Sequence, residues 1–209
     1  MSSPSPLASF HATDLELRRG RRLIWEDASW TVQGATTVVG ANGQGKSSTL
    51  RMLAGQLAPT SGTLSFHAAD GEVSVEAWMT RCSVAAPWLS LPGHLTLDEA
   101  MSFHGVYRTP RRGALHWAAL VQTSGLRVDP SLPVSQWSSG QQQRLMLALA
   151  LGTVADAVLL DEPASNLDEV GIQWMKAQMT AVQALSTVVV ATNDEKKEGL
   201  QGASLLRIG

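Results

Sequence analysis

The sequence TTVVGANGQGKSSTLRMLA, residues 36–54, decides the fold of this chain. The β-branched run 36–39 predicts a buried strand, and the glycine-rich turn at 40–47 leads into a helical pattern from Lys46 to about Ala54. In such a turn, glycines let successive backbone N–H groups close around a chain of phosphates, and the following helix presents its positive end to the same anion. The stretch predicts a nucleotide-binding P-loop, with a plain glycine turn as the alternative.

Two further apolar runs, 157–160 and 187–191, predict buried strands that end in polar residues. Asp161 and Glu162 follow the first run, and Asn193 comes just after the second. Short apolar strands separated by helical segments indicate a parallel sheet that is covered on both faces. Because ligands of such sheets bind at the carboxyl ends of the strands, we expect these three residues to lie beside the P-loop.

The rest of the chain predicts two smaller units around this core. Residues 15–32 carry two short extended patterns about an arginine-rich turn, which indicates an antiparallel start. Helical patterns at 97–107 and 114–124 indicate a helical subdomain at about 88–140. We therefore expect one α/β domain over 1–209, with a mainly parallel P-loop core, an N-terminal antiparallel β-subdomain and a helical subdomain.

Composition narrows the classes of function. A formal net charge of −2 argues against a nucleic-acid partner, which usually demands a strongly basic face. The single cysteine, Cys82, allows no intrachain disulfide and fits a reducing compartment. The start, MSSPSPLASF, has neither the basic segment nor the apolar segment of a signal peptide, and no run is apolar enough to span a membrane. We expect a cytoplasmic protein with a frayed Ser/Pro-rich start.

The P-loop pattern assigns candidate roles to single residues. Lys46 is placed to reach the β- and γ-phosphates, and the Ser47 hydroxyl is placed to bind Mg²⁺. Asp161 is the candidate for holding a water molecule that is bound to magnesium. Glu162 is the candidate for orienting and deprotonating the attacking water. The acidic pair alone is a weak indication, because such pairs often end strands as solvated loop charges. The predicted nucleotide-binding residues of the loop are Gly40, Asn42, Gly43, Gly45, Lys46, Ser47 and Ser48.

The segment WSSGQQQR at 137–144 is similar to the signature sequence of the ABC ATPases, with tryptophan for leucine and serine for the first glycine. It leads into an amphipathic helical pattern ahead of the acidic pair, and SNLD at 165–168 resembles the D-loop of that family. With the P-loop and the acidic pair, four motifs occur in the family's order. The chain therefore resembles the ATP-binding subunits of ABC transporters over essentially residues 7–209.

This resemblance implies a pair of ATPase subunits, either a homodimer or a heterodimer, packed head to tail with ATP between them. Ser138, Gly140 and Gln141 would contact the nucleotide of the partner, and Asp168 would lie at the dimer seam. The resemblance further implies Mg²⁺-dependent ATP hydrolysis that powers separate transmembrane permease subunits, with the chain at the inner face of the cell membrane. The alternative is a soluble ABC ATPase that acts as a nucleotide-dependent switch or regulator.

The chain departs from the family at three positions. Pro87 stands where members usually carry a glutamine that contacts magnesium, and Asn193 replaces the usual switch histidine. An asparagine can donate a hydrogen bond to a γ-phosphate oxygen but is neutral, so we expect slowed hydrolysis. Arg19 stands where the family usually has an aromatic residue that stacks on the adenine base. The Arg19 guanidinium either stacks on the base in its place or belongs to a solvated basic turn.

The segment PWLSLP at 87–92 lies where the family's groove receives a short helix of the transmembrane subunit. Exposed apolar side chains at Trp88 and Leu91 would suit such docking. Packing of both side chains into the core is the equally open alternative.

Overall fold

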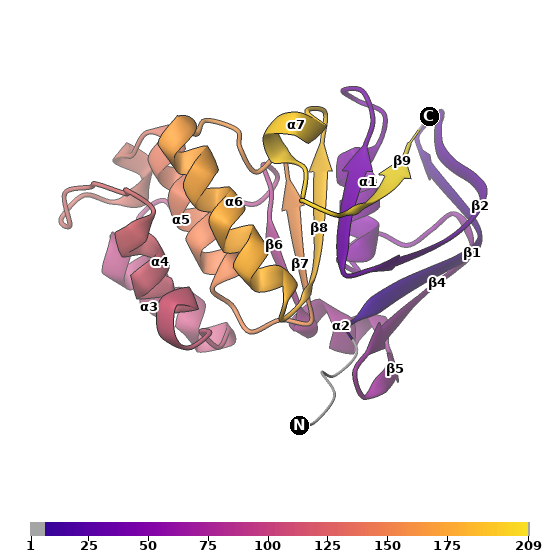
Figure 1. The fold of residues 1–209 in the computed structure, drawn as a ribbon, viewed down its shortest axis with the longest axis horizontal. Helices are drawn as coiled ribbons and strands as arrows, with labels where there is room; N and C mark the ends of the chain where they lie inside the picture. The colour runs from indigo at the N-terminus through magenta and orange to yellow at the C-terminus, as the bar shows by residue number, and fades with distance from the viewer. Residues whose placement is uncertain (1–6, 209) are drawn as a thin grey trace.

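The chain folds into a layered α/β structure, seen in a computed structural model that describes residues 7–208. The expected fraying of the Ser/Pro-rich start therefore falls almost wholly outside the described residues. A five-stranded parallel sheet has the order β6-β7-β8-β3-β9, and a four-stranded antiparallel sheet has the order β2-β1-β4-β5 (Figure 1). The parallel strands are β3 (Ala35–Val39), β6 (Cys82–Ala85), β7 (Ala157–Asp161), β8 (Thr187–Thr192) and β9 (Ser204–Arg207). The predicted α/β fold class is thereby confirmed.

The parallel sheet is buried on both faces because alternate residues of its central strands enter different hydrophobic clusters. Leu159 and Val189 face one cluster, which contains α1 (Lys46–Leu53) and the antiparallel sheet. Val158 and Val188 face the opposite cluster, which contains the long helices of the other side. Successive side chains of a strand point to opposite faces, so the continuous apolar runs follow directly from this double burial. β3, β7 and β8 match the predicted runs to within one residue at each end, whereas β6 and β9 were not predicted.

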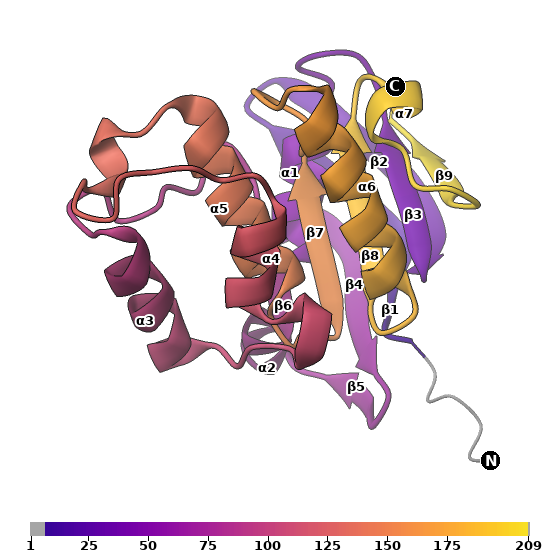
Figure 2. The same ribbon diagram turned by 60° about the vertical axis from the view of Figure 1, so that its left-hand side comes forward.

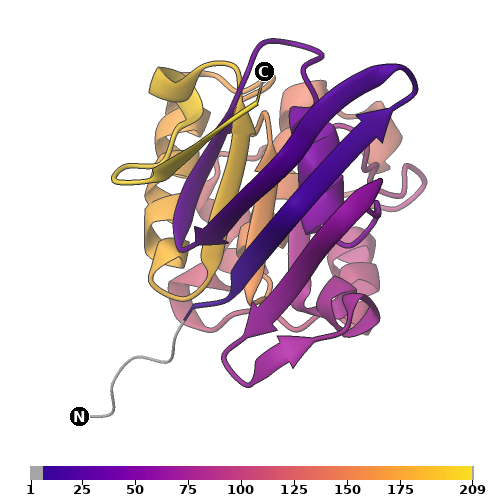
Figure 3. The same cartoon turned by 90° about the vertical axis from the view of Figure 1, so that its right-hand side faces the viewer.

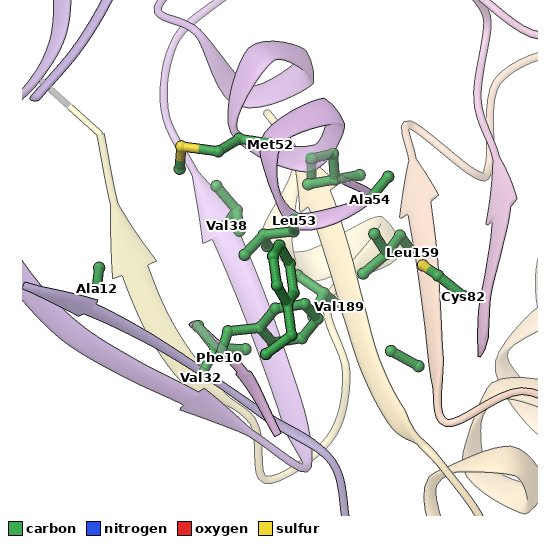
Figure 4. Packing of buried hydrophobic residues seen from close by; sticks show 14 of the residues in the cluster. Phe10, Ala12, Val32, Val38, Met52, Leu53, Ala54, Cys82, Leu159 and Val189 are labelled. Carbon is green, nitrogen blue, oxygen red and sulfur yellow. The ribbon is translucent and has the colours of Figure 1, made fainter. Parts of the chain in front are cut away.

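The antiparallel sheet covers the far side of α1. Its strands are β1 (Ser9–Arg19), β2 (Arg22–Gln33), β4 (Ser61–Ala68) and β5 (Gly71–Val73), and they lie in front of the parallel sheet in Figure 3. β1 and β2 form the predicted antiparallel start, and the turn between them uses Gly20 with φ of 59°. Phe10 from β1 packs beside Leu53 of α1 in the closely packed core of Figure 4. The indole N–H of Trp78, from α2 (Val75–Arg81), donates to the Leu53 carbonyl at 2.8 Å.

Short helices form a group beside the parallel sheet, with α3 (Leu97–Tyr107) and α4 (Trp117–Thr123) on its outer side (Figure 2). α3 has the predicted bounds, and a capping box of Thr96 and Glu99 fixes its start. The second predicted helix, 114–124, is broken, with a short 3₁₀ turn at Gly113–Leu115 before α4. His116 has an extended backbone and its ring accepts the Ala118 N–H, so α4 begins only after it.

The helix α5 (Ser139–Leu151) lies between this helical group and the parallel sheet. The predicted amphipathic pattern is wrong, because the helix is buried on two sides. Leu145 and Leu149 pack with the helical group, whereas Leu147 and Leu151 pack against the sheet. A helix buried on opposite sides needs apolar residues nearly all round.

Two helices complete the described chain. α6 (Glu169–Gln183) lies beside α5 over the parallel sheet, and the short α7 (Glu195–Glu198) follows β8 (Figure 1). Among residues 7–208, no helix combines the length and the apolar character that crossing a membrane requires.

Candidate functional site

The P-loop connects β3 to α1 at the carboxyl edge of the parallel sheet. Gly45 has φ of 115°, and a Cβ atom there would lie 2.5 Å from the Ile24 side chain, so only glycine fits. Gly45 is also the N-cap of α1 and supplies no side-chain cap, which leaves the first N–H groups of the helix for a ligand. The loop borders a cavity of about 360 Å³, which is lined by Asn42, Gly43, Gly45, Lys46, Ser47, Ser48 and Glu162.

Lys46 is buried at 5% exposure, and its ammonium group is held by the P-loop itself. Nζ donates to the carbonyl oxygens of Gly40 at 2.8 Å and Ala41 at 3.2 Å. Gln44 closes the same loop, since its side-chain oxygen accepts the Ala41 N–H. The positive charge thus stands at the cavity without a carboxylate partner among the described residues, available to an anion.

The structure brings Ser47 and Asp161 together, as the sequence predicts. The Ser47 hydroxyl donates to Asp161 Oδ2 at 2.6 Å, while Oδ1 is buried without a hydrogen-bond partner among residues 7–208. Burial raises the pKa of Asp161 to about 6, against an opposing effect of the Ser47 hydrogen bond. A buried, half-satisfied carboxylate beside a hydroxyl is an oxygen donor set that suits Mg²⁺, so these two residues fit the predicted metal site.

Glu162 and Asn193 also lie at this edge. Glu162 has a left-handed backbone with φ of 45°, and its N–H donates to the Ala191 carbonyl of β8 at 2.9 Å. A non-glycine residue in this region is strained, which is typical of functional sites. The Asn193 amide nitrogen donates to Asn42 Oδ1 at 2.8 Å and so reaches the P-loop. β3 and β7 both pair with β8, and this strand order brings the three segments together (Figure 1).

The signature residues lie at the start of α5, and none of them lines the cavity of its own P-loop. Ser138 and Gln141 form a capping box, in which Ser138 N–H donates to Gln141 Oε1 at 2.8 Å. Gly140 packs so closely that a Cβ there would lie 2.6 Å from the Asn166 carbonyl oxygen. The spacing S-x-x-Q from Ser138 to Gln141 is a capping-box pattern that can be recognised in the sequence alone. Contact with a partner's nucleotide stays a prediction for these residues.

Asp168 is the N-cap residue of α6 and anchors the turn that precedes this helix. Its Oδ1 accepts the Gly171 N–H at 2.8 Å and pairs with the guanidinium of Arg144 from α5. Hydrogen bonding to the Gly171 backbone and the nearby Arg144 charge lower the pKa of Asp168. The residue therefore has a structural role within the chain, and its place at a dimer seam stays a prediction.

The arginine hairpin places a different residue near the P-loop from the one that the sequence suggests. Arg19 is exposed at the end of β1 and does not line the P-loop cavity. Arg22 begins β2, and its Nη1 is 3.5 Å from the position that a Cβ on Gly43 would take. Arg22 is not among the predicted contacts, because only the fold of the hairpin brings it near the P-loop. The exposure of Arg19 favours the alternative prediction of a solvated basic turn over a contact with adenine.

The segment after β6 divides into a core part and a groove part. Pro87 is exposed in a turn, and its side chain has no amide oxygen that could bind a metal ion. Trp88 is half-buried against the core, with the Arg51 guanidinium 4.8 Å from its ring, which favours core packing for this residue. Leu89 and Leu91 instead line an apolar groove of about 250 Å³ between this segment, α3 and α5.

The fold and the P-loop with its carboxylates define a P-loop nucleotide-binding protein. The ABC transporter family matches residues 26–165. The chain is 34% identical over 175 residues to the cytochrome c biogenesis ATP-binding export protein CcmA of Novosphingobium aromaticivorans, covering 83% of this chain and 80% of that protein. The CcmA protein of Rhodospirillum rubrum is 30% identical over 207 residues, covering 98% and 88%.

A solved structure from Pyrococcus furiosus, named as an ABC transporter ATP-binding protein, is similar in fold. Its TM-score is 0.77 at 16% identity, covering 95% of this chain and 96% of that one. The chain therefore belongs to the ABC transporter family, as an ATP-binding subunit.

Proposed function

We propose that this chain hydrolyses Mg²⁺·ATP and powers an exporter through separate membrane-spanning subunits, as the names of the CcmA relatives indicate for those proteins. One observation carries the proposal. Asp161 Oδ1 is buried without a hydrogen-bond partner among residues 7–208, and Oδ2 accepts the hydroxyl of Ser47, which lines the P-loop cavity together with Lys46 and Glu162. Groups suited to phosphate binding, to holding a metal ion and to acting as a general base would thereby be combined at one site.

Lys46 and the free N–H groups of α1 would hold the β- and γ-phosphates. Ser47 and Asp161 would hold Mg²⁺, which supplies neutralisation of the charge on the phosphate oxygens. Glu162 would accept a proton from the water that attacks the γ-phosphorus. The bond from that phosphorus to the bridging oxygen breaks, so ADP leaves with the electron pair and inorganic phosphate forms.

Two replacements support slow turnover. The Pro87 side chain has neither a hydrogen-bond donor nor an oxygen ligand, so it cannot take the place of a glutamine at the metal centre. The Asn193 side chain is neutral and donates a hydrogen bond to Asn42 of the P-loop. At the γ-phosphate it would offer only this short amide group, where a histidine would offer an imidazole. Loss of one positioning group costs on the order of a hundredfold in rate, because charge develops on the transferred phosphoryl group. Asn193→His should therefore raise turnover, and a flat or lower rate would refute this role for Asn193.

A second ATPase subunit, either another copy of this chain or a homologue, would complete the site. Among the described residues, none at the N-terminus of α5 lines the cavity of its own P-loop, and Ser138 and Ser139 there are exposed. A helix N-terminus favours an anion. The first turn of α5, with Ser138, Gly140 and Gln141, would therefore close over the triphosphate of the partner.

The apolar groove beside α3 supports docking of the membrane subunit. Leu89 and Leu91 line it, and α3 adds an exposed aromatic pair, Phe103 and Tyr107, whose ring centroids are 5.8 Å apart. Exposed apolar side chains of this kind mark interaction sites. The chain would then sit at the inner face of the cell membrane through its partner.

A soluble nucleotide-dependent switch is the second candidate, and Pro87 with Asn193 is the feature that favours it. A transport subunit should hydrolyse ATP faster once its membrane partner is bound, whereas a switch should not. Hydrolysis by the purified chain is the first test, with Lys46→Ala as the inactive control. Wild-type turnover no higher than that of Lys46→Ala, with and without the co-purified membrane partner, would contradict the proposed function.

A further inference from the structure

A carboxylate outside the assigned site is buried next to it. Glu198 is the last residue of α7, and only 4% of the residue is exposed. It lines a cavity of about 240 Å³ together with Glu162, Ser165 and Asn193. Burying an ionisable group is costly unless it is paired, so its position needs an explanation beyond a solvated charge.

Glu198 spans two segments that are far apart in sequence. Its Oε1 accepts the backbone N–H of Ala164 at 2.8 Å, while Oε2 is buried without a hydrogen-bond partner among the described residues. Ala164 belongs to the turn 162–168, which begins with the strained Glu162 and also contains a left-handed Asn166 with φ of 62°. The carboxylate therefore ties this turn to the segment that follows β8.

The opposite side of the same turn is held by α5. Gln143 donates from Nε2 to the Pro163 carbonyl at 2.9 Å, and Gly140 provides the space for the Asn166 carbonyl. The turn 162–168 is thus held between α5 on one side and α7 on the other. Without the Glu198 contact, the Ala164 N–H would be buried without an acceptor, which costs more than an ordinary hydrogen bond contributes.

We propose that Glu198 is a positioning residue, which holds the turn 162–168 so that Glu162 faces the nucleotide and the end of the turn meets the partner subunit. The idea rests on the proposed function. Asn193 reaches the P-loop of its own chain, and Glu198 lies on the helix that follows it. A change at the γ-phosphate would thereby pass from α7 to the turn through the hydrogen bond that the Ala164 N–H donates to Glu198.

The test compares Glu198→Ala with Glu198→Gln in the full chain. Glutamine keeps a side-chain oxygen for the Ala164 N–H, whereas alanine removes it. We expect Glu198→Ala to lower kcat on the order of tenfold with KM for ATP changed less than about twofold, and Glu198→Gln to retain most of kcat. Glu195→Ala and Glu195→Gln are the matched controls, because Glu195 begins the same helix and is exposed; both should leave kcat unchanged.

Amide hydrogen exchange of the turn 162–168 gives a second readout that needs no turnover. Exchange there should accelerate in Glu198→Ala and stay slow in Glu198→Gln. Absence of hydrolysis in the wild-type chain would count against the proposed function alone, and exchange would then decide the role of Glu198. Equal effects of alanine and glutamine on both readouts, or a loss of kcat accompanied by an equal loss of ATP affinity and thermal stability, would overturn the inference.

Discussion

Replacing Asp161 with asparagine should stabilise the nucleotide-free chain at neutral pH, although it removes a predicted metal ligand. Burial raises the pKa of Asp161 from 3.8 to about 6. A carboxyl group with a higher pKa in the folded chain than in the unfolded chain lowers stability once it ionises. The cost is small below pH 3.8, grows as the pH rises, and is complete above pH 6. This rise in pKa corresponds to roughly 3 kcal/mol of unfolding free energy.

Asparagine has nearly the same shape and no charge, and its amide oxygen can still accept the Ser47 hydroxyl. Urea unfolding with a chelator should therefore show Asp161→Asn more stable than the wild type by about 2–3 kcal/mol near pH 7.5. The difference should fall to about 1–2 kcal/mol near pH 5, where part of the wild-type carboxyl group is protonated in the folded chain. Added Mg²⁺·ATP should stabilise the wild type more than the variant, because the ion binds the ionised carboxylate.

Asp98→Asn is the matched control, since Asp98 is exposed in the first turn of α3 and should change stability by less than about 0.5 kcal/mol. A variant that is less stable than the wild type near pH 7.5, or a difference that does not change with pH, would refute the reasoning about Asp161.

Two further pairs of substitutions test the packing at the start of α5 and the contact of the arginine hairpin with the nucleotide. Gly140→Ala should destabilise the chain by about 1–3 kcal/mol in urea unfolding, because its Cβ would meet the Asn166 carbonyl oxygen at 2.6 Å. Gly105→Ala in α3 would make only an ordinary van der Waals contact with the Trp117 ring at 3.5 Å, and should be neutral or stabilising by up to about 1 kcal/mol. Arg22→Ala should raise KM for ATP severalfold, whereas Arg19→Ala should not; the reverse order in steady-state kinetics would restore Arg19 as the nucleotide contact.

The sequence was sufficient to predict the core of the fold for a physical reason. Strands β3, β7 and β8 are buried on both faces, so their apolar runs are continuous and end abruptly at polar residues. The glycines of the P-loop are required by the geometry of the loop itself. Motifs of this kind depend on neighbours in sequence and are readable without a structure.

Elements with mixed patterns were not predicted. β4 lies in the antiparallel sheet with only part of its residues buried, and its sequence, SGTLSFHA, has no clear alternation. α5 was misjudged because its two buried sides are decided by what packs on each of them, which a helical pattern does not reveal. Burial patterns set by tertiary contacts override local patterns.

Two residues near the site were invisible to sequence reasoning. Arg22 approaches the P-loop because the hairpin of β1 and β2 folds across α1, and Glu198 sits in EKKE, residues 195–198, which looks like a run of solvated charge. Glu198 is instead buried because Gly199 ends α7 and the chain turns back towards the sheet. Such placements depend on contacts between distant segments, which no local pattern encodes.

The central claim is that ATP bound to the P-loop of one subunit is closed over by the start of α5 from another. Sedimentation of purified Glu162→Gln with Mg²⁺·ATP tests it most directly, because hydrolysis is blocked while binding is kept. We predict a species of twice the monomer mass with Mg²⁺·ATP and a monomer with Mg²⁺·ADP, and no such shift in the double variant that also carries Lys46→Ala. A chain that stays monomeric with saturating Mg²⁺·ATP, both alone and with a co-purified ATPase homologue, would contradict the account.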